Sequence, residues 1–105
     1  MFARNVSLYL KPNTRSEFTR IFDKEVIPML RKQSGFRDEI IFAFPGGLKV
    51  VAVSLWDTKE HAEAYKTASY PEVLKMLHKV LDGTPKVQVS DVISSTIHKP
   101  AAMAA

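Results

Sequence analysis

The sequence contains no cysteine, and this absence excludes several chemistries at once. Disulfide bonds, thiolate metal ligands and thiol nucleophiles are all ruled out, so packing alone must hold the fold. The chain has only four glycines, and they form no phosphate-binding loop; no serine-nucleophile motif is present either. Its three histidines occur in neither an HxH nor an HxxxH spacing, so we predict no metal site.

Long hydrophobic runs and a strong charge asymmetry are also missing. No segment approaches the roughly 20 apolar residues of a membrane span, and the N-terminus lacks an apolar signal region. We therefore expect a cytoplasmic protein with no membrane partner. The 15 basic residues are interspersed with 11 acidic ones. A nucleic-acid interface would concentrate its basic residues on one face, so we predict no nucleic-acid partner.

The size and composition fit a single domain. A chain of 105 residues with 46% hydrophobic content can bury one continuous core. We expect the domain to extend over residues 1–99. Residues 100–105 contain a proline followed by alanines and one methionine, which predicts a flexible C-terminal tail.

The N-terminal part of the chain predicts a strand followed by a helix. Apolar and polar residues alternate over 2–10, with Arg4 as the charged exception on the apolar side. Thr14 and Glu17 form a capping-box pattern, which predicts that a helix begins there. Apolar residues then recur at spacings of three and four. Pro28 interrupts this pattern, and we expect the helix to kink or restart because proline lacks the backbone donor.

The middle of the chain predicts a β-hairpin. Residues 36–44 and 48–56 are rich in apolar, β-branched and aromatic residues. Only Pro45-Gly46-Gly47 separates them, and a connection this short joins antiparallel neighbours.

The rest of the chain predicts two helical segments and a last strand. Asp57 followed by Glu60 indicates a helix start, and residues 58–68 are good helix formers. A proline in a first helical turn then introduces a helix over 72–81. The β-branched stretch 85–98 predicts the final strand, and its alternation slips near the middle, as a bulge would cause.

This element order predicts an α+β, ferredoxin-like βαββαβ fold, in which a four-stranded antiparallel sheet carries both helical regions on one face. The third strand is apolar on both sides. We expect Val51, Val53 and Leu55 to face the helices, which leaves the neighbouring apolar residues on the opposite face. A sheet with one wet face alternates between apolar and polar residues. We therefore predict a homodimer whose sheets pack face to face and enclose a space, a dimeric α+β barrel.

Several segments resemble one family, the antibiotic biosynthesis monooxygenase superfamily of dimeric α+β barrels. The likeness extends over nearly the whole chain, from Phe2 to Ile97, and it implies the same fold and a homodimer. The segments that carry it are Asn5-Val-Ser-Leu-Tyr9, the Gln33-Ser-Gly35-Phe36 step out of a proline-interrupted helix, the hairpin end Leu55-Trp56, and the helical run from Lys59 to Tyr65.

The candidate site lies on the sheet face opposite the helices. Alternation places Asn5, Ser7 and Tyr9 there on the first strand, and we expect Ser54 and Trp56 to share that side. An amide, hydroxyls and an indole within apolar walls suit a flat, partly polar organic molecule.

The resemblance implies a chemistry for this site. Superfamily members that oxidise polyphenols or quinols use neither metal nor flavin, and Asn and Trp side chains orient the ring while its anion reacts with oxygen. Asn5 and Trp56 match these catalytic positions, which implies a cofactor-independent monooxygenase. The structural alternatives stay open: Asn5 as an amide at the sheet edge, and Trp56 as core packing.

Haem-degrading members provide a second template. They carry an Asn on the first strand, a Trp in the helix after the third strand, and a His in the next helix. Asn5 and His78 match, but Tyr65 occupies the Trp position, which argues against haem degradation. Helical spacing places His78 at the edge of the core, where a histidine is often solvated. A third hypothesis is a non-catalytic barrel that binds a small molecule.

Overall fold

A computed structural model describes residues 1–98 of the chain. Its elements, in chain order, are β1 (Phe2–Tyr9), α1 (Arg15–Ile21), η1 (Phe22–Val26), α2 (Ile27–Arg31), β2 (Phe36–Ala43), β3 (Lys49–Trp56), α3 (Lys59–Ala68), α4 (Tyr70–Leu77), η2 (His78–Val80) and β4 (Lys86–Asp91). The predicted tail over 100–105 lies outside the described residues.

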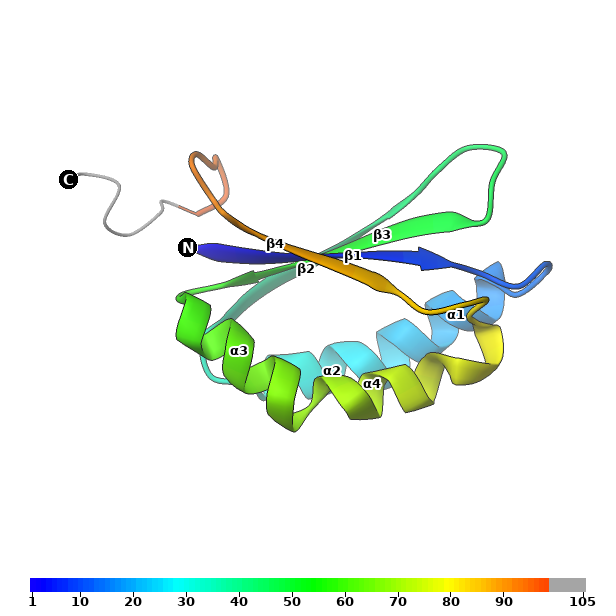
Figure 1. The fold of residues 1–105 in the computed structure, drawn as a ribbon, viewed down its shortest axis with the longest axis horizontal. Coiled ribbons are helices and arrows are strands. Elements are labelled where there is room, and N and C mark those ends of the chain that lie inside the picture. Colours follow the sequence, from blue (N-terminus) through cyan, green and yellow to red (C-terminus); the bar gives the residue numbers. More distant parts are fainter. Residues whose placement is uncertain (99–105) are drawn as a thin grey trace.

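The four strands form one antiparallel sheet in the order β2-β3-β1-β4. All the helices gather on one side of this sheet, and the other face is open (Figure 1). The predicted ferredoxin-like α+β fold is confirmed. No helix within residues 1–98 is both long enough and apolar enough to cross a membrane.

The first helical region is interrupted at Pro28, as predicted. η1 is a π-helix that separates α1 from α2, and Pro28 lies in the first turn of α2. Because proline cannot donate a backbone hydrogen bond, the wider π-turn before it accommodates the missing bond. Phe22 and Val26, at the two ends of η1, are both buried.

The helix starts differ in detail from the predicted caps. α1 begins after Thr14 as expected, but the Thr14 hydroxyl donates to the carbonyl of Lys11 at 2.6 Å and forms no cap bond, so the predicted capping box is absent. The N-cap of α3 is Thr58 rather than Asp57. The Thr58 hydroxyl accepts a hydrogen bond from the backbone N–H of His61 at 3.1 Å.

The last strand is shorter than predicted. β4 ends at Asp91, where a bulge had been expected, and all six of its residues are exposed. A register shift occurs instead in β2, between Phe36 and Asp38. After β4 the chain crosses toward β2, where His98 contacts the Asp38 carboxylate.

The orientation predicted for β3 is wrong. The register with β1 pairs Phe2 with Trp56 and Val6 with Ala52, and paired residues share a face of the sheet. Trp56 is 0% exposed beneath the helices. Residues 50–53 are all apolar, so alternation alone cannot say which face of β3 turns inward. The helix-facing set of β3 is therefore Val50, Ala52, Ser54 and Trp56.

The open face of the sheet is apolar at its centre, as the sequence predicts. Val51, Val53 and Leu55 of β3 lie there, only partly buried. On the neighbouring strand β2, Ile40 is paired with Val53 and Phe42 with Val51. Phe42 is 51% exposed. The helices thus shelter one face of the sheet and leave a second apolar face uncovered.

Candidate active site

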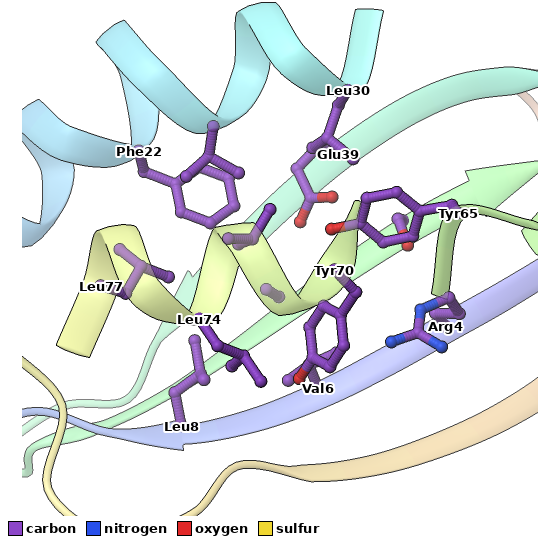
Figure 2. A pocket seen from close by; sticks show the side chains of 14 residues that line it. Arg4, Val6, Leu8, Phe22, Leu30, Glu39, Tyr65, Tyr70, Leu74 and Leu77 are labelled. Carbon is purple, nitrogen blue, oxygen red and sulfur yellow. The ribbon is translucent and has the colours of Figure 1, made fainter. Parts of the chain in front are cut away.

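A cavity lies between the sheet and the helices (Figure 2). Its volume is about 30 Å³, which is room for about two water molecules. Most of its wall is apolar, and five polar side chains interrupt that wall. The lining residues are Arg4, Val6 and Leu8 of β1, Phe22 and Val26 of η1, Leu30 of α2, Glu39 of β2, Ala52 and Ser54 of β3, Tyr65 of α3, and Tyr70, Val73, Leu74 and Leu77 of α4.

Arg4 is the buried cation of this cavity. Its side chain is 2% exposed because the alternation of β1 turns it toward the helices together with its apolar neighbours. Its guanidinium carbon lies 4.6 Å from the centre of the Tyr70 ring and 5.6 Å from that of Tyr65. Among the described residues, its Nε and Nη2 have no hydrogen-bond partner. A buried charge without such partners is costly, so these two nitrogens favour binding of an acceptor group.

Glu39 provides a carboxyl group in the same cavity. It is paired with Ser54 across β2 and β3, so its side chain shares the helix-facing side of the sheet. Burial raises the pKa of Glu39 to about 8, and the positive charge of Arg4 opposes this rise only in part. A carboxyl group that titrates near neutral pH can accept or donate a proton during a reaction.

Two phenols complete the polar lining. Burial raises the pKa of Tyr65 above its usual range, and the nearby Glu39 adds to the rise. Burial also raises the pKa of Tyr70. Both phenols are therefore neutral at physiological pH and can donate a hydrogen bond. Figure 2 shows the Glu39 carboxyl and the Tyr65 hydroxyl directed into the same space.

Trp56 supports the wall of the cavity from behind. Its indole N–H donates to the Ser54 hydroxyl at 2.9 Å, and its ring stacks on Tyr65 at a centroid distance of 4.9 Å. Phe36 packs edge-on against the other side of the indole, at 5.5 Å. This arrangement fixes the orientation of Ser54 and Tyr65.

The structure separates the residues that the sequence had grouped into one site. Ser54, Trp56 and Tyr65 lie on the helix side, whereas Asn5, Ser7 and Tyr9 lie on the open face. The prediction that Asn5 and Trp56 share one chamber is wrong, because the β1–β3 register turns them to opposite faces. The Asn5 amide donates to the Gln88 carbonyl at 3.3 Å and to the Ser90 hydroxyl at 3.1 Å. Tyr9 is 51% exposed.

His78 does not approach the cavity. It is exposed at the start of η2 and is not among the residues that line the cavity. Within residues 1–98, no three carboxylate or imidazole side chains converge as a metal site requires.

Sequence reasoning missed Arg4, Glu39 and Tyr70 as site residues. Arg4 did give a signal, since a charged residue at an apolar position of an alternating strand predicts a buried charge. Glu39 and Tyr70 gave none, because their proximity to Arg4 depends on the packing of β2 and α4 around β1.

A larger cleft adjoins the cavity and shares Arg4 and Tyr70 with it. The cleft has a volume of about 300 Å³ and opens between α3 and the helix-facing side of β4. Its lining combines four apolar side chains with the buried Arg4, two lysines, one glutamate and one tyrosine. The lining residues are Phe2, Arg4, Lys59, Ala62, Glu63, Lys66, Tyr70, Val87 and Val89.

Comparison with solved structures shows a consistent likeness. The chain superposes on the monooxygenase ActVA-Orf6 of Streptomyces coelicolor, solved with the ligand Nanaomycin D, with a TM-score of 0.76 and 19% identity over 93% of this chain and 92% of that one. The chain has the fold of the antibiotic biosynthesis monooxygenases. A variant of SnoaB, a cofactor-independent oxygenase from Streptomyces nogalater, shares this fold with a TM-score of 0.73 and 12% identity, over 92% of this chain and 97% of that one.

The antibiotic biosynthesis monooxygenase fold also occurs in a protein of unknown function. This protein, from Nitrosomonas europaea, matches with a TM-score of 0.76 and 13% identity, over 93% of this chain and 94% of that one. No family model matches the sequence, and no curated protein matches it either. At these identities the likeness shows the fold alone.

Proposed function

We propose that the protein is a cofactor-independent monooxygenase that oxidises a small aromatic or quinol-type substrate in the cavity between the sheet and the helices. The observation that carries the proposal is the pair Arg4 and Glu39, a cation and a titratable carboxyl group within one apolar cavity. Support comes from the shared fold of ActVA-Orf6, described as a monooxygenase, and of SnoaB, described as a cofactor-independent oxygenase.

The cavity supplies what an oxidation without a cofactor requires. Glu39 in its carboxylate form takes a proton from a substrate hydroxyl, and Arg4 stabilises the resulting anion. The anion gives electrons to dioxygen, and a hydroperoxide forms at a ring carbon. Loss of water from the hydroperoxide leaves a carbonyl group. A quinol and one dioxygen thus give a hydroxyquinone and one water, and the ring supplies all four electrons.

The remaining predicted residues take supporting roles in this proposal. Trp56 and Ser54 hold Tyr65 in place, and Tyr65 donates a hydrogen bond to the substrate. Asn5, Ser7 and Tyr9 lie on the open face and therefore take no part at the reacting ring. The cavity is too small for a ring as it stands, so substrate entry requires the partly exposed side chains of Tyr70 and Leu74 to move aside.

Oxygen uptake tests the proposal. Purified protein is incubated with a panel of quinols and phenols at pH 8, and oxygen consumption and hydroxyquinone formation are measured together. Glu39→Gln should lower kcat by about 100-fold, because the amide cannot take the proton. Glu25→Gln, at an exposed position of η1, should retain the wild-type rate. Background oxygen uptake with every quinol would refute catalysis and leave a non-catalytic binding protein.

We also propose that two copies pair through their open sheet faces. A four-stranded face of ordinary dimensions covers about 350 Å². Burying a whole face of this size against a second copy contributes up to about 9 kcal/mol before the cost of association. A twofold axis would bring Val53 of β3 close to the same strand of the partner.

A substitution that places a charge at the centre of the open face tests the dimer proposal. Val53→Lys should convert a dimer into a folded monomer in sedimentation-velocity runs, because two lysines would meet near the axis. Thr67→Lys, at an exposed position of α3 on the helix side, adds the same charge away from the open face and should leave the dimer intact. A wild-type chain that sediments as a monomer at micromolar concentration would end the dimer proposal, but would leave the cavity within each chain unaffected.

A further inference from the structure

The two unpartnered nitrogens of Arg4 define a binding geometry. Nε and Nη2 lie on one edge of the planar guanidinium, so their N–H bonds run parallel. A carboxylate accepts both bonds at once through its two oxygens, and this is the strongest pairing available to an arginine. Within residues 1–98 neither nitrogen has a hydrogen-bond partner, although Arg4 is 2% exposed.

We infer that the site selects aromatic substrates that carry a carboxylate, and that Arg4 binds this group through Nε and Nη2. The inference rests on the proposed function for the identity of the reacting ring. The inference adds that a ring must carry a carboxylate substituent in order to bind at the site.

The charges around Arg4 favour an anionic ligand. Glu39 is the acidic side chain that lines the cavity with Arg4, and it is mostly protonated at neutral pH because burial raises its pKa to about 8. It therefore leaves the charge of Arg4 largely uncompensated. In the cleft lining, Lys59 and Lys66 outnumber Glu63, whose carboxylate lies 3.9 Å from the Lys59 ammonium. The remaining positive charge attracts an anion toward Arg4.

The position of Arg4 also suits a ligand of this shape. Arg4 and Tyr70 line both the small cavity and the larger cleft, so they stand at the boundary between the two. A carboxylate held at this boundary directs the hydroxylated side of its ring toward Glu39. The rest of a larger molecule then lies in the cleft against Phe2, Val87 and Val89. The Tyr65 ring, 5.6 Å from the Arg4 guanidinium carbon and stacked on Trp56, keeps the cation in place.

Binding without turnover tests the inference separately from catalysis. Benzoate and benzamide have nearly the same shape, neither carries a hydroxyl group to oxidise, and only benzoate is charged. Isothermal titration calorimetry at pH 7 should show benzoate binding to wild-type protein at least about tenfold more tightly than benzamide. Arg4→Met should abolish this preference, and Arg31→Gln, at an exposed position at the end of α2, should retain it.

Arg4→Lys provides a second variant that keeps the positive charge. It should retain part of the benzoate preference but lose its bidentate component, because an ammonium is a point charge. If Arg4→Met does not fold by circular dichroism, the wild-type ratio and Arg4→Lys decide the question. Equal binding of benzoate and benzamide to wild-type protein, or a preference that survives Arg4→Met, would overturn the inference.

The two proposals fail in different ways. Oxidation of uncharged quinols without any benzoate preference would overturn the carboxylate inference alone. A benzoate preference that depends on Arg4, combined with background oxygen uptake, would overturn catalysis alone and identify a binding protein for aromatic acids.

Discussion

Replacing Glu39 by glutamine should change how the stability of the protein depends on pH. Burial raises the pKa of this carboxyl group from 4.5 to about 8 in the folded protein, so the folded state holds its proton more tightly than the unfolded chain does. The tightly held proton of Glu39 therefore stabilises the folded state in full below pH 4.5. This stabilisation is lost as the pH rises through 8. At 1.36 kcal/mol per pKa unit, the loss amounts to about 5 kcal/mol.

Glutamine is neutral throughout this range, so Glu39→Gln should remove that pH dependence. Urea unfolding, followed by circular dichroism at one protein concentration from pH 5 to 9, measures the difference between variant and wild type. The gain in stability of the variant over wild type should rise from about 1 kcal/mol at pH 5 to about 4 kcal/mol at pH 8. Glu25→Gln, at an exposed position, should follow the wild-type curve. Parallel curves for Glu39→Gln and wild type would show that Glu39 is solvated and refute the reasoning.

Three further predictions concern the surroundings of single side chains or of one glycine. Trp56→Phe loses the 2.9 Å hydrogen bond to Ser54 and part of the stack on Tyr65, and should destabilise the protein by about 1 to 3 kcal/mol in urea unfolding; a change below about 0.5 kcal/mol would contradict this packing. Gly35 has a φ of +77°, and an added Cβ would lie 2.3 Å from the His61 ring and 2.7 Å from the His61 Cβ; Gly35→Ala should cost about 2 kcal/mol or more, and adding His61→Ala should recover only the part due to the ring. Because His78 is exposed, wild type and His78→Ala should give the same absorption spectrum with added haem, and a Soret shift that depends on His78 would restore the haem hypothesis.

The sequence predicts the fold well because the decisive signals are local. Pro45-Gly46-Gly47 leaves room only for a tight connection between two strands, and Pro28 removes a donor wherever the helix runs. The resulting hairpin and interrupted helix are both observed. These features depend on neighbours along the chain, so one sequence suffices to predict them.

The candidate site could not be predicted in the same way. Val50, Val51, Ala52 and Val53 are all apolar, so alternation does not reveal which face of β3 turns toward the helices. The register with β1 decides this orientation, and that register depends on contacts between residues far apart in sequence. The predicted site consequently combined side chains from both faces of the sheet.

The exposure of β4 has a consequence for how molecules reach the interior. This strand hydrogen-bonds to β1 along one edge, and all six of its residues are exposed. Segments with little burial open locally at a small fraction of the global unfolding free energy. Val87 and Val89 form one wall of the cleft, so a brief separation of this strand would widen the approach to Arg4 while the helices stay in place. Hydrogen exchange should therefore be faster along β4 than along the other three strands.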